Sequence, residues 1–144
     1  MMMSTSDHAA IERACARLIS EYAYLNDQRR YEELAALFTP DALLFRPSAP
    51  DQAIAGIDAI LAAFRKRPLD VMTFHVCTDI IVSVDDAASA RGQSRILLLS
   101  ARRPAEDGPR PTAAETPVPG VFYDRFRLTE SGWKFAERRG SFWI

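Results

Sequence analysis

The spacing of apolar residues changes once along this chain, and that change limits the folds open to it. Up to about residue 66, apolar residues recur every three or four positions, whereas from residue 73 onward they tend to alternate with polar ones. The first period predicts helices and the second predicts strands. A chain with its helices first and its strands afterwards is expected to form an α+β fold, with helices on one face of an antiparallel sheet.

The first part of the chain predicts three helices and one short strand. Ser6 or Asp7 can cap the first helix, because their side-chain oxygens accept hydrogen bonds from free backbone N–H groups. Pro40 ends the second helix, since proline disfavours helical backbone at the residue before it. The expected bounds are residues 7–25, 31–38 and 57–66 for the helices and 42–46 for the strand.

The second part predicts four longer strands with an irregular excursion between the second and the third. That excursion, residues 102–119, contains five prolines and is expected to be a loop or lid. The strands are expected at residues 73–84, 88–101, 121–128 and 133–143. Three helices on one face of a strongly curved sheet leave a cone-shaped cavity, which is a natural small-molecule pocket. We expect a single domain over residues 1–144, with residues 1–6 flexible.

Composition excludes several classes of partner and cofactor. Lys and Arg number 18 and Asp and Glu number 19, so the chain lacks the cationic surplus of a nucleic-acid-binding protein. It has neither a membrane-spanning apolar run nor a visible secretory signal, and its two cysteines, Cys15 and Cys77, suggest reduced thiols and a cytoplasmic location. Its two histidines and two cysteines are scattered, and there is no glycine-rich phosphate loop, so no metal or other cofactor is expected.

Two residues far apart in the sequence, Asp27 and His75, are candidates for proton transfer. His75 shares one face of its predicted strand with Thr73 and Cys77. Taken alone, His75 could be a structural hydrogen-bonding residue, and Asp27 could cap the second helix. If the two side chains meet in an apolar cavity, the carboxylate fixes the imidazole tautomer and the ring can act as a base near neutral pH.

Basic residues near the predicted pocket leave more than one interpretation open. Strand alternation puts Lys134, Ala136 and Arg138 on one face of the last strand and Phe135, Glu137 and Arg139 on the other. Arg138 could therefore bind an anion in the cavity, face solvent, or pair with Glu137 or Asp124. The cluster Arg65-Lys66-Arg67 is interpreted as a solvated turn.

Four stretches of sequence resemble one known family. They are residues 24–42 (YLNDQRRYEELAALFTPDA), 56–60 (GIDAI), 73–78 (TFHVCT) and 132–139 (GWKFAERR). They resemble the SnoaL-like branch of the nuclear-transport-factor-2-like superfamily over residues 7–142. This resemblance implies a cone-shaped α+β barrel that usually forms dimers through its sheet.

The resemblance also implies roles for individual residues. Two enzyme families of the branch, scytalone dehydratase and hexachlorocyclohexane dehydrochlorinase, match this chain around Asp27 and His75, and the dehydrochlorinase also matches at Arg138. These three would be the catalytic residues. The same comparison implies substrate-binding positions at Tyr22, Leu44, Ile96, Leu98, Gly120 and Phe122.

The sequence therefore predicts a small cofactor-independent lyase or isomerase that acts on an apolar cyclic molecule. Asp27 would orient His75, and His75 would remove a proton next to an electron-withdrawing group. Two alternatives stay open: a non-catalytic ligand-binding or subunit module, and a polyketide-type cyclase. The first is motivated by Ser100, Gly120 and Phe122, which stand where the dehydratase has polar substrate contacts. We expect a homodimer that binds a small apolar ligand and neither nucleic acid nor membrane.

Overall fold

The computed structural model describes residues 2–103, 105, 107–111 and 113–144. Three helices precede most of the sheet, and the strands after the third helix are long, as the change of period predicted. The helices are α1 (Thr5–Asp27), α2 (Tyr31–Ala35) and α3 (Ile57–Arg65). The strands are β1 (Phe38–Phe45), β2 (Ile54–Ala55), β3 (Val71–Asp86), β4 (Ser89–Arg102), β5 (Val118–Thr129) and β6 (Gly132–Phe142).

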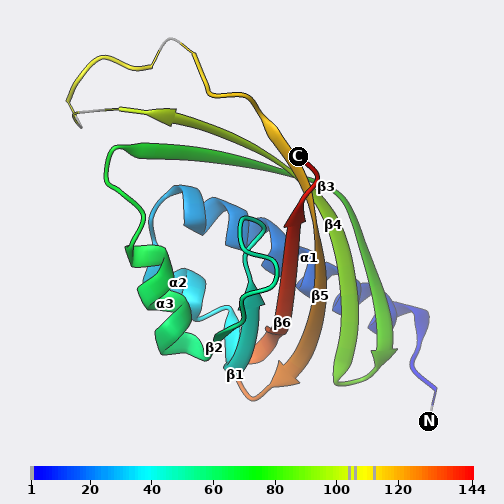
Figure 1. Ribbon diagram of the computed structural model, residues 1–144. Helices are drawn as coiled ribbons and strands as arrows, with labels where there is room; N and C mark the ends of the chain where they lie inside the picture. Colours follow the sequence, from blue (N-terminus) through cyan, green and yellow to red (C-terminus); the bar gives the residue numbers. More distant parts are fainter. Residues whose placement is uncertain (1, 104, 106, 112) are drawn as a thin grey trace.

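The strands form one curved sheet in the order β2-β1-β6-β5-β4-β3. Figure 1 shows this sheet bending around α1, with α2 and α3 beside the edge formed by β1 and β2. The prediction of an α+β fold with a curved sheet and three helices is confirmed. The expectation of a wholly antiparallel sheet is wrong, because β1 runs parallel to its neighbour β6.

The core lies between α1 and the concave face of the sheet. The buried residues of α1 recur at helical spacing, as the sequence predicted, and include Ile11, Cys15, Ile19 and Tyr22. They pack against buried side chains of the strands, among them Leu44, Ile96, Phe122, Phe126 and Phe135. The concave face is therefore filled along the middle of α1.

Two boundaries in the first part differ from the expectation. Helix α1 begins at Thr5, because the Ser4 hydroxyl accepts from the Asp7 N–H at 3.1 Å and the Asp7 carboxylate accepts from the Ser4 N–H at 3.2 Å. Ser4, rather than Ser6 or Asp7, is the cap. Helix α2 ends at Ala35, and residues 38–41 belong to β1 rather than to a helix and its stop.

The excursion between β4 and β5 is shorter than expected, because β4 continues to Arg102 and β5 begins at Val118. The Glu115 N–H donates to the Ser100 carbonyl at 2.8 Å, which holds the returning chain against β4. Pro104, one of the five prolines that motivated the prediction, lies outside the described residues, as does Met1. Among the helices that the structure describes, none is long and apolar enough to cross a membrane.

Candidate functional site

The Asp27 carboxylate and the His75 imidazole are in direct contact. Asp27 Oδ1 lies 2.6 Å from His75 Nδ1, and Asp27 Oδ2 accepts from the His75 backbone N–H at 2.8 Å. Both side chains are 13% exposed. One carboxylate thus holds His75 by its main chain and by its ring, which fixes the orientation of the ring and leaves Nε2 as the second nitrogen.

The end of α1 and the start of β3 bring these two residues together. Asp27 is the last residue of α1, and His75 is in the first half of β3. Arg29 has a positive φ of 58°, which turns the chain just after the helix. Its guanidinium donates to the Pro68, Leu69 and Val71 carbonyls. Arg29 therefore ties the C-terminus of α1 to the segment that leads into β3.

A second layer of hydrogen bonds holds the Asp27 carboxylate. The Thr73 hydroxyl donates to Asp27 Oδ1 at 2.8 Å and accepts from Arg67 Nη1 at 2.8 Å. Arg67 also donates to the Asn26 side-chain oxygen at 3.0 Å and to the Asn26 carbonyl at 2.7 Å. Because Arg67 can only donate, the single hydroxyl proton of Thr73 is left for Asp27.

A cavity of about 360 Å³ opens beside His75, between the C-terminal half of α1, helix α3 and the concave face of the sheet. A pocket of this size can hold a small cyclic molecule. Its wall combines aromatic, aliphatic and basic side chains. The lining residues are Tyr22, Asn26, Arg46, Pro47, Ser48, Ala63, Phe64, Lys66, Arg67, Thr73, His75, Leu98, Phe122 and Phe142.

The predicted substrate-binding positions divide into two groups. Tyr22, Leu98 and Phe122 line the cavity, whereas Leu44, Ile96 and Gly120 are buried and do not line it. At Gly120, a Cβ atom would lie 2.8 Å from the Ser141 carbonyl oxygen of β6. The small residue at position 120 therefore permits the close approach of two strands rather than the approach of a ligand.

Arg138 does not line the cavity either. Its side chain is fully buried, and its Nε lies 3.2 Å from Asp124 Oδ1 on the neighbouring strand. The guanidinium carbon lies 3.7 Å from the centre of the Phe122 ring, 4.2 Å from that of Tyr22 and 4.9 Å from that of Phe135. Among the interpretations of Arg138 left open by the sequence, the structure shows the ion pair with Asp124, behind the aromatic wall of the pocket.

A β-bulge explains why the predicted faces of β6 are wrong. Arg125 pairs with Glu137 and Phe126 pairs with Phe135, so Ala136 has no partner on β5. The extra residue reverses the alternation. Phe135 and Arg138, which strict alternation puts on opposite faces, are therefore both buried in the core.

Burial shifts the ionisation of several groups around the pocket. It raises the pKa of Tyr22 to about 12, against the opposing effect of the Arg138 and Arg46 charges, so this phenol stays protonated at neutral pH. It also raises the pKa of Asp124 to about 6, although Arg138 acts in the opposite direction. The pKa of the Cys77 thiol is raised by burial as well.

Sequence reasoning missed the contribution of Arg67 and Arg46. The cluster Arg65-Lys66-Arg67 was expected to be a solvated turn, but Arg67 is half-buried and reaches Asn26 and Thr73. The position of this cluster could have indicated its role, since it lies at the C-terminal end of α3, shortly before the strand that carries His75. Arg46 follows β1 directly, and nothing in its sequence neighbourhood distinguished it.

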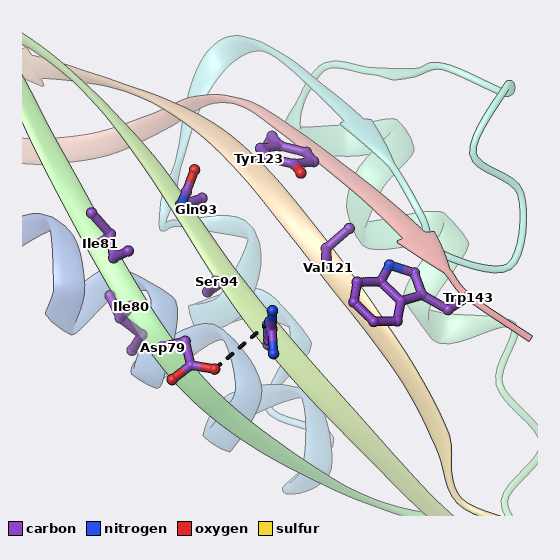
Figure 2. Close-up of a pocket in the computed structure, with 9 residues that line it drawn as sticks. Asp79, Ile80, Ile81, Gln93, Ser94, Val121, Tyr123 and Trp143 are labelled. Carbon is purple, nitrogen blue, oxygen red and sulfur yellow. Dashed lines mark ion pairs between the residues drawn. The ribbon is translucent and has the colours of Figure 1, made fainter.

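A larger hollow of about 490 Å³ lies on the other face of the sheet, away from Asp27 and His75. Figure 2 shows its lining, and the dashed line that starts at Asp79 marks an ion pair. The partner of Asp79 in that pair is Arg95. Ile81 is 53% exposed there, Tyr123 58% and Trp143 61%. This hollow is open and carries none of the predicted site residues.

Within the part of the chain that the structure describes, no group of three His, Cys, Asp or Glu side chains is placed to hold a metal ion.

Comparison with solved structures gives fold relatives at low sequence identity. A candidate scytalone dehydratase from Novosphingobium aromaticivorans DSM 12444 is 23% identical with a TM-score of 0.82, over 98% of this chain and 89% of the other. The type 3 hexachlorocyclohexane dehydrochlorinase LinA from Novosphingobium barchaimii LL02 is 18% identical with a TM-score of 0.78, over 98% and 92%. A protein from Catenulispora acidiphila in complex with S-DNPA is 22% identical with a TM-score of 0.68, over 93% and 94%.

No curated protein sequence matches the chain significantly. A family model does, however, and the family is the one that the four sequence stretches indicated. The model of the SnoaL-like domain matches residues 7–139, which include Asp27, His75 and Arg138. By this match and by its fold, the chain belongs to the SnoaL-like domain family.

Proposed function

We propose that this protein is a small-molecule lyase or isomerase in which Asp27 and His75 act together as a general acid–base pair. The observation that carries the proposal is the 2.6 Å contact between Asp27 Oδ1 and His75 Nδ1 at the wall of a cavity. A carboxylate and an imidazole in this arrangement form a proton-transfer unit in many enzymes.

The chemistry follows from the tautomer that the contact favours. With its Nδ1 proton directed at Asp27, His75 carries a lone pair on Nε2, which can remove a proton from a carbon next to an electron-withdrawing group. The Asp27 carboxylate then stabilises the imidazolium. The resulting carbanion either expels a leaving group, which takes up the proton from His75, or is protonated at another carbon. The first outcome is an elimination and the second is a double-bond migration.

The pocket contains donors that can stabilise the negative charge of such an intermediate. Tyr22 lines the cavity, and its raised pKa keeps the hydroxyl proton available for a hydrogen bond to an enolate oxygen. Arg67 lines the cavity as well. We expected Arg138 in this role, but its contact with Asp124 and its position behind Phe122 and Tyr22 remove it from the proposed mechanism.

The relatives support a reaction of this class. A candidate dehydratase and a dehydrochlorinase share the fold over nearly the whole chain, and their names describe eliminations.

One observation favours a second function, a ligand-binding module without catalysis. Arg138, which by resemblance would have been the third catalytic group, does not reach the cavity.

Deuterium exchange tests the proposal without knowledge of the leaving group. The protein is incubated in D2O with a panel of cyclic ketones and hydroxyketones, and loss of the proton next to the carbonyl is followed by NMR. For any compound that exchanges, Asp27→Asn and His75→Ala are each expected to slow exchange at least about a hundredfold, which is the scale of general-base catalysis.

Two matched variants separate a catalytic defect from a general one. His8→Ala removes the other histidine, near the start of α1, and Asp70→Asn removes a carboxylate that pairs with Arg102. Both are expected to exchange at the wild-type rate, and circular dichroism should show that all four variants are folded. Exchange that persists in Asp27→Asn and His75→Ala would exclude the pair as a catalyst. Binding of a panel compound without exchange would favour the ligand-binding module.

A further inference from the structure

The charged side chains on the wall of the pocket beside His75 are basic. Three cationic side chains line it, from Arg46, Lys66 and Arg67, and no carboxylate is among the lining residues that the structure describes. The nearest acid of the site, Asp27, contacts His75 and Thr73 instead. A partly enclosed site whose wall carries more cations than anions attracts anions, because low-dielectric walls strengthen the field inside it.

Arg46 and Lys66 are available to a ligand. Arg46 lies just after β1, with its guanidinium carbon 6.0 Å from the centre of the Phe64 ring. Lys66 caps the C-terminus of α3 and is exposed. Within the described part of the chain, neither side chain makes a hydrogen bond or an ion pair, and the Arg46 Nε is buried without an acceptor.

Arg67 differs from Arg46 and Lys66, because the Thr73 hydroxyl links its guanidinium to the Asp27 carboxylate. Its hydrogen bonds go to the Asn26 oxygens and the Thr73 hydroxyl, which are all uncharged. A guanidinium stays protonated even when partly buried. Arginines elsewhere in the molecule commonly have a carboxylate within ion-pair distance. They include Arg17, Arg30, Arg65, Arg91, Arg102, Arg127 and Arg139.

The remaining wall of the cavity suits a ring. Tyr22, Phe64, Phe122 and Phe142 present aromatic side chains and Leu98 an aliphatic one. A flat apolar body can stack on or slide between such groups, while a charged substituent stays near the basic side chains.

We propose that the pocket takes a cyclic organic carboxylate, with the ring on the aromatic wall beside His75 and the carboxylate held by Arg46 and Lys66. This inference rests on the pocket of the proposed function and narrows its substrate class. It replaces the expectation of a purely apolar ligand. Arg46 can bind a carboxylate through two parallel N–H groups, and Lys66 supplies a second charge.

Isothermal titration calorimetry with a matched pair of probes tests this proposal. The probes are 2-naphthoate and 2-naphthamide, which share a ring system and differ in charge. At low salt, the wild-type protein is expected to bind the naphthoate at least about tenfold more tightly, which is the scale of one charge-assisted contact. Added KCl should reduce that preference, because screening weakens exposed charge pairs.

Substitutions locate the preference in the pocket. The double variant Arg46→Gln with Lys66→Gln is expected to bind the two probes about equally, and Arg46→Lys should keep part of the preference. Arg125→Gln removes an exposed charge from the outer face of the sheet and is expected to leave the preference unchanged. Equal binding of the two probes by the wild type, no binding of either, or a preference that survives in the double variant would each overturn the proposal.

The binding experiment tests the carboxylate site and the exchange experiment tests the acid–base pair, so either proposal can be rejected without the other. His75→Ala is expected to keep the preference for naphthoate, because the ring nitrogen is not part of the carboxylate contact. Loss of the preference with intact deuterium exchange would reject the carboxylate and leave the acid–base pair standing. A retained preference in a protein that never exchanges a proton would leave the anion pocket standing and reject the catalyst.

Discussion

The core contains an ion pair between Arg138 and Asp124. Both side chains are fully buried, and the guanidinium lies among the rings of Tyr22, Phe122 and Phe135. Taking two charges out of water is costly, and their attraction does not always offset that cost. The raised pKa of Asp124 shows the same balance, since burial outweighs the neighbouring charge.

Removal of Arg138 should therefore destabilise the fold in a pH-dependent way. Asp124 has a pKa of about 6 in the fold against an ordinary value of 3.8, so the stability from its protonated form is lost as the pH rises through 6. Without Arg138 that pKa moves higher and the loss continues to higher pH. We expect Arg138→Met to lower the free energy of unfolding by about 3–5 kcal/mol near pH 8, and by less near pH 5.

Urea unfolding followed by tryptophan fluorescence at the two pH values measures this difference. The double variant Arg138→Met with Asp124→Asn has no buried carboxyl at this site. It should recover much of the lost stability, and its difference from wild type should depend on pH far less than that of the single variant. An equal loss for Arg138→Met at both pH values would show that Asp124 does not respond to the charge of Arg138.

Among the elements, the sequence predicted the three helices and the five longer strands, but not the short strand β2, the start of β1 or every strand face. The α1 stripe and the long strands follow from a regular period, which a sequence displays directly. The bulge at Ala136 does not, because it depends on how β5 and β6 pair. The strand start at Phe38 was missed for a similar reason: the segment around Pro40 becomes a strand only by pairing with β6, far along the chain.

The sequence likewise predicted some residues of the candidate site and missed others. Motif resemblance was enough to name Asp27 and His75, and their contact then follows from the fold. Arg67 and Arg46 carry no motif, and they enter the site only because α3 and the end of β1 close over one end of the sheet. The family resemblance implied that Leu44, Ile96 and Gly120 line the pocket, but all three are buried outside its lining. An inward-facing residue lies in the core or at the pocket according to its position along the strand. The alternation of apolar and polar residues does not indicate that position.

Gly140 in β6 connects strand packing to the shape of the pocket. A Cβ atom there would lie 2.5 Å from Pro47 Cγ and 2.7 Å from Phe122 Cε1, and both of those residues line the cavity. Gly140→Ala is expected to lower the free energy of unfolding by about 1–3 kcal/mol through overpacking. It should also weaken 2-naphthoate binding, because Pro47 and Phe122 must move.

Gly92→Ala is the matched control for this effect. Its Cβ would lie 2.8 Å from Phe126 Cε2, in the core and away from the cavity lining. Thermal unfolding and calorimetry should show both variants destabilised and only Gly140→Ala impaired in binding. Equal affinity in the two variants would show that the wall formed by Pro47 and Phe122 does not shape the ligand site.

At the scale of the whole molecule, the two faces of the sheet differ in how they are covered. Helix α1 covers the concave face (Figure 1). The outer face exposes large apolar side chains, among them Phe74, Ile81, Tyr123 and Trp143. Exposed apolar groups that gather on one face commonly mark an interface between proteins. A twofold axis through this face would pair each exposed side chain with a copy of the same face.

Because the outer face is not covered by a helix and exposes these large apolar side chains, we predict that the protein is a dimer through it. Ile81→Glu would place a carboxylate in each half of the interface, and a buried unpaired charge disfavours association strongly. Sedimentation velocity should give a dimer for the wild type and a monomer for Ile81→Glu. Leu69→Glu is the control, since Leu69 is 90% exposed between α3 and β3 and its substitution should leave the dimer intact. A wild-type monomer at micromolar concentration, or a dimer that tolerates Ile81→Glu, would contradict the prediction.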